Sequence, residues 1–538
     1  MPVVRRAPRP SPSVAALVLA GVVALVGVAL VDVAQAQVPT QDTGGQSPVV
    51  VAAPPAVPAP AEAAPAEVAQ ASPLPDEPSP DGVPQRLVLA LDGVPYAMFA
   101  QLQAEGHFAD YGPAARMVSS FPSLSGVSFA AIGGGEIPEG YQEMRYDPET
   151  NQVVGNTLYT LSGRAHQNLP ADNSPHSLTH RVVGYMAPYT MAMRDLARIR
   201  EELLASRKAG FVAYLAQSDV ILHVDGADAG RAFLIDLEAW LATLQAEVRT
   251  RTGRDLLVDL VSDHGSTLVK GKQVNLPRQL AHCGYRRNDT IDGPRDVAYS
   301  LAGIIGSVAV TARPESVEPV ANCLASADGV ELVAVDRGDR VGVLGAGGSE
   351  AEVRLLPGTP ERYAYRSVRG DPLALLDRAS VAANGERVFE AEAQFRASLD
   401  SKYPDALRRL WRAFHGSVQD PSPILLSLAD GREAGYRTVR SLAWLRGRGG
   451  THGSLTASAS LGVIASNWRA VDDVDCWQAR EALFGDATRM ASRTATPLRS
   501  TTAAETPASA PANAGVTGAT PAAAGAGASA AQRTAAQP

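Results

Sequence analysis

The sequence predicts an α/β fold in which a mostly parallel central sheet is covered by helices on both faces. Three short apolar runs, at 86–90, 210–216 and 256–261, are each followed within three residues by an aspartate. Continuous apolar runs of this length are typical of strands buried on both faces. Helical patterns at 191–207 and 232–249 precede the second and third runs. Strands and helices therefore alternate, as they do in a parallel sheet with helical connections.

Acidic residues mark the carboxyl ends of these predicted strands. The first strand ends at Asp92 and leads into a helical stretch at 94–103, while Asp219 follows the second strand and Asp263 the third. Ligands of open parallel sheets bind beyond the carboxyl ends of the strands. The pattern therefore predicts a functional site at this edge of the sheet.

The segment between His264 and His452 is less regular than the part before it. It contains short apolar runs at 301–310 and 330–335, and we expect an inserted subdomain within about 268–445. The folded domain as a whole is expected to cover residues 85–493.

The two flanking segments have a different composition. Residues 37–84 are dominated by Ala, Pro and Val, and residues 494–538 by Ala, Thr, Gly and Pro. Such segments bury too little apolar surface to offset the entropy of ordering. A disordered linker and a disordered tail are therefore predicted on either side of the folded domain.

Residues 1–36 have the parts of an export signal. A basic flank with Arg5 and Arg6 precedes an apolar run at 14–31, and Ala34-Gln35-Ala36 offers small residues at the two positions that a signal peptidase reads. We expect cleavage after Ala36 and a periplasmic or extracellular protein. The apolar run is also just long enough to span a bilayer, so an uncleaved N-terminal membrane anchor is the alternative.

Charge and cysteine content exclude two classes of function. The net charge is -8 and no Lys/Arg cluster is interleaved with aromatic residues, so no nucleic-acid polymer is expected as a partner. Cys283, Cys323 and Cys476 stand singly, without the Cys-x-x-Cys pair of a thiolate zinc site. An exported protein can pair two of them and leave one free, and the sequence leaves open which two.

Two pairs of residues have the spacing of metal ligands. Asp219 and His223 are four positions apart, which places both side chains on one face if the turn is helical. Asp263 and His264 lie together at a strand end. Carboxylate and imidazole side by side form a natural pair of ligands for a divalent metal ion. Taken alone, each pair is equally compatible with an ordinary acid and a core histidine.

Three further residues have simple structural explanations when each is considered alone. His452 lies in a glycine-rich loop, where a solvated histidine is unremarkable, and Asp92 can cap the helix that follows it. Ser125 precedes a stretch that can begin a helix, so it can be a plain N-cap.

The order and spacing of these residues point to a known superfamily. The chain resembles the alkaline phosphatase superfamily and, within it, the nucleotide pyrophosphatase/phosphodiesterase branch. The motifs that carry the resemblance are Leu91-Asp92-Gly93, Phe121-Pro122-Ser123-Leu124-Ser125, Asp219 to His223, Ser262-Asp263-His264-Gly265 and Gly450-Thr451-His452-Gly453. They extend from about residue 85 to about 467 and exclude both tails and the inserted segment.

This resemblance implies an alkaline phosphatase-like catalytic domain with two divalent metal ions, Zn²⁺ being the first choice for imidazole and carboxylate ligands. One ion would be held by Asp219, His223 and His452, and the other by Asp92, Asp263 and His264. Ser125 would be the nucleophile. The implied reaction is hydrolysis of a small phosphodiester or pyrophosphate in two displacements, through a phosphoseryl intermediate.

Three positions depart from the diesterase pattern. That branch has Pro-Asn two and three residues after its nucleophilic Thr, where this chain has Val127 and Ser128, and the nucleophile is Ser instead of Thr. A phosphomonoesterase or a phosphotransferase of the same superfamily is therefore the alternative. A non-catalytic metal-binding envelope protein is the alternative from another class. A sulfatase is not expected, because the segment Ser125-Gly126-Val127-Ser128-Phe129 lacks the required Cys/Ser-x-Pro-x-Arg pattern.

Overall fold

The computed structural model describes residue 74 and residues 77–155, 169–173, 178–300, 303–378, 381–382, 385–435 and 449–485. The predicted export signal and the predicted C-terminal tail lie outside these residues, as does most of the predicted linker. None of the helices in the described part of the chain combines the length and the apolar character that a membrane crossing requires.

The carboxyl end of the predicted linker is folded, which corrects the expectation of disorder up to residue 84. The Ser79 N–H donates to the Arg207 carbonyl at 2.7 Å, and the Ala209 N–H donates to the Glu77 carbonyl at 2.7 Å. Val83 is buried and belongs to the hydrophobic core. The folded domain therefore begins several residues before the predicted boundary, because this segment pairs with the start of the edge strand that follows Ala209.

The central sheet has six strands in the order β19-β2-β18-β6-β1-β5. The strands are β1 (Arg86–Leu91), β2 (Ala115–Val118), β5 (Gly210–Leu215), β6 (Leu257–Ser262), β18 (Leu461–Ser466) and β19 (Val474–Asp475). β1 pairs in parallel with β5 and β6, and β18 alone runs antiparallel to its neighbours β6 and β2. The predicted mostly parallel central sheet is confirmed.

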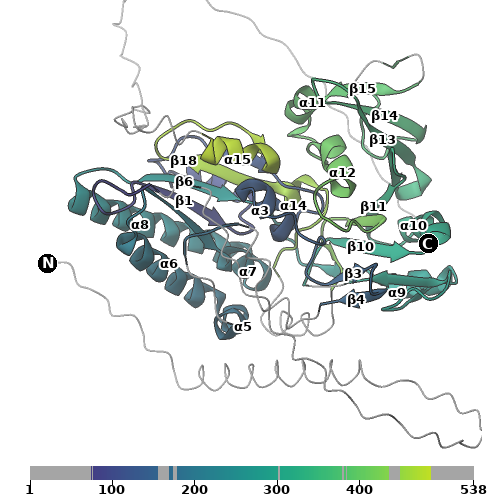
Figure 1. The fold of residues 1–538 in the computed structure, drawn as a ribbon, viewed down its shortest axis with the longest axis horizontal. Helices are drawn as coiled ribbons and strands as arrows, with labels where there is room; N and C mark the ends of the chain where they lie inside the picture. The colour runs from purple at the N-terminus through teal and green to yellow at the C-terminus, as the bar shows by residue number, and fades with distance from the viewer. Residues whose placement is uncertain are drawn as a thin grey trace, which may run out of the picture. The chain divides into compact units, whose positions relative to one another are not determined.

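Helices cover both faces of this sheet (Figure 1). The side chains of β1 point alternately to the two faces of the sheet, which shows how the sequence produces this arrangement. Leu87, Leu89 and Leu91 pack into one core, and Val88 and Ala90 pack into another. The first core is completed by α2 (Tyr96–Ala104), α6 (Pro188–Ala205), α7 (Gln217–Val224) and α8 (Ala227–Thr252), and the second by α3 (Ser125–Gly133) and α15 (Cys476–Phe484). A further helix, α5, spans Leu178–Met186.

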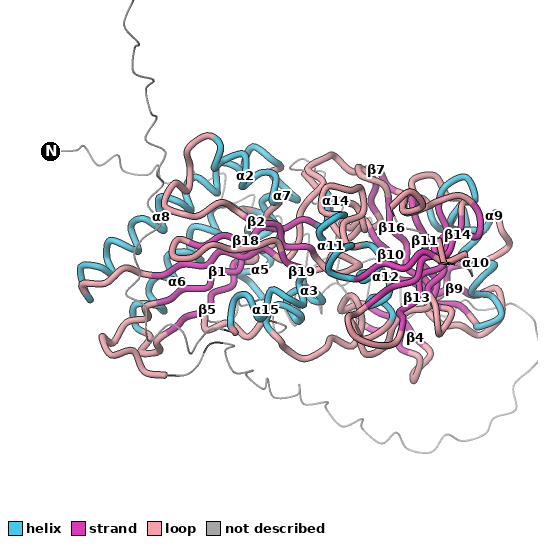
Figure 2. The backbone as a smooth tube through the Cα atoms, turned by 90° about the horizontal axis from the view of Figure 1, so that it is seen from above, coloured by secondary structure: helices cyan, strands magenta, loops and turns pink. Residues whose placement is uncertain are grey.

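A second sheet is built from the segment between His264 and His452. Its order is β15-β14-β13-β12-β11-β16-β10-β9-β8, and its neighbours pair antiparallel except for β8 and β9. The strands are β8 (Arg286–Arg287), β9 (Asp296–Tyr299), β10 (Ser307–Ala312), β11 (Val330–Asp336), β12 (Val341–Gly345), β13 (Glu350–Leu356), β14 (Arg362–Arg369), β15 (Arg387–Glu390) and β16 (Ile424–Leu428). Figure 2 shows the strands of both sheets in magenta.

Helices also cover the second sheet. α9 (Leu276–His282) and α10 (Val317–Ala325) pack on one side, and α12 (Ala406–Phe414) packs on the other. The remaining short elements are β3 (Arg145–Asp147), β4 (Gln152–Val154), β7 (Lys272–Gln273), β17 (Arg432–Glu433), α11 (Ala391–Ser398), α14 (Ala457–Ser460) and the 3-10 helices Pro314–Ser316 and Ala346–Gly348.

The three cysteines have one pairing in the structure. Cys283 and Cys323 form a disulfide that links the end of α9 to α10, and Cys476 at the start of α15 is buried and free. The sequence left this pairing open, because it does not reveal that α9 and α10 lie side by side.

Candidate active site

The turn between β2 and α3 presents Ser125 to the carboxyl end of the central sheet. Ser125 is the first residue of α3, and Leu124, not Ser125, occupies the N-cap position. The Ser125 hydroxyl donates to Asp92 Oδ1 at 3.0 Å and lies 3.2 Å from His264 Nε2. The alternative explanation of Ser125 as a plain N-cap does not hold, because Leu124 takes that position and the Ser125 side chain is directed at a carboxylate and an imidazole.

Asp92 follows β1 directly and is held on both sides. Its Oδ1 accepts the Ser125 hydrogen bond, and its Oδ2 accepts a short hydrogen bond from the Tyr214 hydroxyl. The N-cap of the following helix α2 is Pro95, so Asp92 does not cap it. Tyr214 lies in β5 beside β1, at a position that sequence reasoning missed, because its apolar run predicts a strand and not a role for one hydroxyl.

Gly93 allows two aspartates to approach the same backbone segment. Its φ angle is +70°, and a Cβ atom at this position would lie 2.4 Å from Asp219 Oδ1. The Gly93 N–H donates to Asp263 Oδ1 at 3.1 Å. Any side chain here would be strained and would displace Asp219, so the Asp-Gly sequence is required by the packing of the site.

Three histidines share one hydrogen-bonding pattern. The Nδ1 atom of His223 lies 2.8 Å from the Gly450 carbonyl, that of His264 2.8 Å from the Gly265 carbonyl, and that of His452 2.8 Å from a third carbonyl, on Ser123. A carbonyl oxygen only accepts, so each Nδ1 carries a proton. In its neutral form, each ring therefore presents an unprotonated Nε2 on the opposite side.

The Nε2 atoms face three carboxylates. His223 Nε2 lies 3.2 Å from Asp219 Oδ2, and His452 Nε2 lies 3.8 Å from the same oxygen. His264 Nε2 lies 3.4 Å from oxygens of both Asp92 and Asp263. The prediction that Asp219 and His223 share one face of a helical turn is confirmed by α7. His452 is only 6% exposed, so it is not a solvated loop residue.

The ligand atoms form two compact groups. One group is Asp92, Asp263 and His264, and the other is Asp219, His264 and His452, with the ligand atoms of each group within 4.8 Å of one another. The first group is the set that the resemblance implied. In the second, His264 stands where His223 was expected, although His223 Nε2 contacts the same Asp219 oxygen as His452 does.

Burial and mutual charge shift the pKa values of this cluster. Burial raises the pKa of Asp263 to about 8, against the attraction of His264. Burial lowers the pKa of His452 to about 3, with His264 contributing. For His264, burial opposes the charged form, but Asp263 and the hydrogen bond to Asp92 raise the pKa to about 10. Without a cation, the cluster therefore needs protons to balance its buried carboxylates.

The donor set fits divalent metal ions. Asp219 Oδ1 and Asp263 Oδ2 are buried and accept no hydrogen bond from the described residues. Buried carboxylate oxygens without partners are costly, and a metal ion supplies the missing positive charge. The protonated Nδ1 atoms also orient the three rings for coordination through Nε2. The described residues that contact the six ligands and Ser125 include no lysine or arginine side chain.

Ser128 does not replace the Asn of the diesterase pattern. Its hydroxyl is fully buried and lies 2.7 Å from Ser119 Oγ and 2.9 Å from Ser120 Oγ, within the turn that precedes α3. The Ser128 hydroxyl therefore stabilises this turn.

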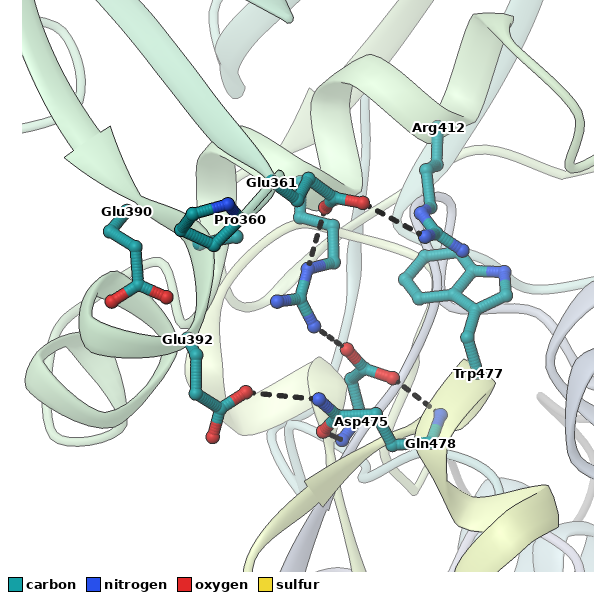
Figure 3. A pocket seen from close by; sticks show the side chains of 10 residues that line it. Pro360, Glu361, Glu390, Glu392, Arg412, Asp475, Trp477 and Gln478 are labelled. Atoms are coloured by element: carbon teal, nitrogen blue, oxygen red, sulfur yellow. Dashed lines mark hydrogen bonds and ion pairs between the residues drawn. The ribbon is translucent and has the colours of Figure 1, made fainter. Parts of the chain in front are cut away.

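A separate cavity of about 430 Å³ shares no lining residue with this cluster. It lies where β14, α11 and α12 meet the start of α15, and Figure 3 shows Glu361, Arg412, Asp475 and Trp477 around it. Its polar lining is already ion-paired, through Arg412 to Glu361 and through Arg408 to Asp475.

Fold and cluster together define an α/β protein with an acid–imidazole site and a hydroxyl at the carboxyl ends of its strands. No protein-family model and no curated protein matches the chain. Among solved structures it is similar to human ectonucleotide pyrophosphatase/phosphodiesterase 5, with 12% identity over 75% of this chain and 95% of that chain and a TM-score of 0.42. The murine protein of the same name gives 12% identity, the same coverage and a TM-score of 0.41.

Proposed function

We propose that the chain is an exported two-metal hydrolase that cleaves phosphodiester or pyrophosphate bonds, with Ser125 as the nucleophile. The observation that carries the proposal is the common orientation of the three histidines. Each donates Nδ1–H to a backbone carbonyl and turns Nε2 toward a carboxylate, and His264 Nε2 also lies 3.2 Å from the Ser125 hydroxyl. A structural acid–base cluster does not require this arrangement, whereas metal coordination does.

The six ligand candidates would hold two divalent ions, with Zn²⁺ the best match to imidazole and carboxylate donors. When bound, such ions bind phosphoryl oxygens and lower the pKa of a coordinated hydroxyl. Asp92, Asp263 and His264 form one donor group, and Asp219 and His452 with His223 form the other. His264 lies between the two groups and would join whichever ion is nearer its Nε2 atom.

The protein's own groups around Ser125 suit attack on phosphorus. Asp92 accepts the hydrogen bond of the Ser125 hydroxyl, which orients the oxygen lone pairs and offers a base for the proton. At the start of α3, the N–H groups of Gly126 and Val127 precede the first helical hydrogen bond, which the Ser128 N–H donates to the Leu124 carbonyl at 3.0 Å, so they have no acceptor within the helix. They would donate to the non-bridging oxygens of a phosphoryl group on Ser125.

The charge balance favours diesters over monoesters. A monoester dianion carries one more negative charge on its non-bridging oxygens than a diester does, and stabilising it takes additional positive charge. None of the described contacts of Ser125 and the six ligands is a lysine or arginine. The proposed substrate is therefore a small phosphodiester or pyrophosphate, and the export signal would deliver the enzyme to a periplasmic or extracellular substrate.

The test uses purified full-length protein, bis(p-nitrophenyl) phosphate and p-nitrophenyl phosphate, each with saturating zinc and with chelator. We expect zinc-dependent hydrolysis and a higher kcat/KM for the diester. A ratio well below one would leave a phosphomonoesterase. Zinc binding without hydrolysis of either ester would favour a non-catalytic metal-binding protein. Absence of zinc binding would refute the metal site.

A further inference from the structure

A fully buried arginine connects the second sheet to the turn that carries Ser125. Arg409 lies on α12, whose apolar residues pack on the second sheet, and its side chain is 0% exposed. Figure 1 shows α12 between the strands labelled β13 and the part of the chain that contains α14 and α3. The helix α12 packs on the second sheet, whereas the guanidinium of Arg409 reaches the turn that carries Ser125. Arg409 can therefore fix the position of this turn relative to the second sheet.

The guanidinium makes hydrogen bonds to both segments that frame the candidate site. On the turn before α3, Nη2 donates to the Ser120 carbonyl at 3.0 Å and to Ser123 Oγ at 3.1 Å. On the segment after His452, Nη1 donates to the Leu455 carbonyl at 3.0 Å and Nη2 to Ser460 Oγ at 2.6 Å. A lysine has one nitrogen and cannot span these acceptors in the same way.

Ser123 is the residue where this network meets the candidate metal ligands. Its Oγ accepts from Arg409, while its carbonyl oxygen accepts from His452 Nδ1 at 2.8 Å. Its N–H donates to the Gly453 carbonyl at 3.2 Å, and its hydroxyl donates to the Ser454 carbonyl at 2.8 Å. Ser123 lies two residues before Ser125, so the same short turn sets the positions of a nucleophile and a ligand.

The acceptors of Arg409 are all neutral, which makes its burial costly. Burial lowers the pKa of Arg409 to about 10, with the charge of Asp405 opposing this effect. Burying a cation among carbonyl and hydroxyl oxygens costs desolvation free energy, and an apolar residue of similar volume would avoid this cost. Only the arginine, and not an apolar residue, can make directed hydrogen bonds to both segments.

We infer that Arg409 is a positioning residue, which fixes the Ser125 turn against the His452 segment through Ser123. The inference rests on the proposed function for its catalytic consequence, but its structural part can be measured without metal or substrate. Losing hydrogen bonds to a charged group costs about 1.5–3 kcal/mol, equivalent to about 10- to 100-fold faster amide exchange by local opening. The affected amides are those of Ser119 and Ser123, which bond across to the segment after His452.

The experiment compares amide hydrogen exchange in residues 119–126 and 453–460 among wild-type protein, Arg409→Lys, Ser123→Ala and the control Arg408→Lys. Arg408 is also buried and lies on the same helix, but its partners are the carboxylates of Asp405, Asp475 and Glu361. We expect about 10- to 100-fold faster exchange in both segments for Arg409→Lys, a smaller increase for Ser123→Ala, and wild-type exchange there for Arg408→Lys.

Two further readouts separate this inference from the proposed function. Competition with a chelator should show about 10- to 100-fold weaker zinc binding in Arg409→Lys, and kcat for the diester should fall more than KM changes. If wild-type protein neither binds zinc nor hydrolyses esters, the proposed function fails while amide exchange still decides the role of Arg409. If Arg409→Lys does not fold, Ser123→Ala decides. Wild-type exchange in both segments of Ser123→Ala, or equal acceleration in Arg408→Lys, would overturn the inference.

Discussion

Replacing Asp263 by asparagine should make the metal-free protein more stable and reduce its stabilisation by zinc. Asp263 is completely buried, its Oδ1 accepts from the Gly93 N–H, and its Oδ2 accepts no hydrogen bond from a described residue. Asparagine has the same shape, carries no charge and can still accept from Gly93 through its amide oxygen. The substitution therefore removes the charge while leaving the one hydrogen bond in place.

The magnitude follows from the raised pKa of Asp263, which is about 8 in the folded protein against 3.8 for the ordinary carboxyl. Because the folded pKa is the higher one, the stability due to the bound proton is complete below about pH 4 and is lost progressively as the pH rises to about 8. The slope is about 1.4 kcal/mol per pH unit, so at pH 7 the loss reaches at most about 4 kcal/mol. The Asp263→Asn variant has no carboxyl group at this position, so it does not lose this stability as the pH rises.

Zinc should narrow the difference between the two proteins. Saturation at about 100 times the dissociation constant adds about 2.7 kcal/mol per site to the wild type. The variant lacks a carboxylate of the group with Asp92 and His264, so it should gain little from that site. Stability would be measured by urea unfolding between pH 5 and 8, with chelator and with zinc.

The control is Asp225→Asn, because Asp225 ends α7 two residues after the ligand candidate His223 but is not itself one of the six ligand candidates. That variant should keep both the pH dependence and the zinc response of the wild type. The reasoning is refuted if Asp263→Asn without metal is less stable than wild type at pH 7, or if zinc stabilises both proteins equally.

Three other variants test separate parts of the structure. Ser125→Ala should lower kcat for bis(p-nitrophenyl) phosphate by at least about 1,000-fold while zinc affinity, measured by chelator competition, stays within about threefold, because the hydroxyl is the proposed nucleophile and not one of the six ligand candidates. Tyr214→Phe leaves Asp92 Oδ2 without its hydrogen bond and should destabilise the protein by about 1–3 kcal/mol in urea unfolding, with an unchanged value speaking against that bond. Replacing Cys283 and Cys323 together by serine opens a loop with a separation of 40 residues and should cost about 3–4 kcal/mol, whereas reducing agent should have no effect on that variant.

The sequence predicted the central sheet and the convergence of its polar residues, for a physical reason. Continuous apolar strands buried on both faces leave few alternatives to a covered parallel sheet, and acids placed just after such strands must meet at one edge. Asp92, Asp219 and Asp263 therefore come together as expected, although their division between two metal ions was taken from a resemblance and remains a proposal. His264, which lies near all three carboxylates, makes that division less distinct than the motifs suggest.

Other features depend on contacts that no local pattern reveals. The nine-stranded sheet pairs short strands that alternate only partly, and the antiparallel insertion of β18 depends on segments that are far apart in sequence. Arg409 resembles any arginine of an amphipathic helix until its six hydrogen bonds are known. Ser128 stands where the diesterase pattern has Asn, and only the packing of the turn shows that its hydroxyl is already used.

The position of β2 in the central sheet affects the order in which the site can form during synthesis. Among the described strands, β2 is bonded to β18 and β19, which the ribosome produces last. A nascent chain that has just passed His452 already contains Ser125 and all the ligand candidates, but the strand leading into the Ser125 turn still has no neighbour. The candidate site would therefore assemble only after residue 475 has emerged, so an unfinished chain carries all the residues of the site without their final arrangement.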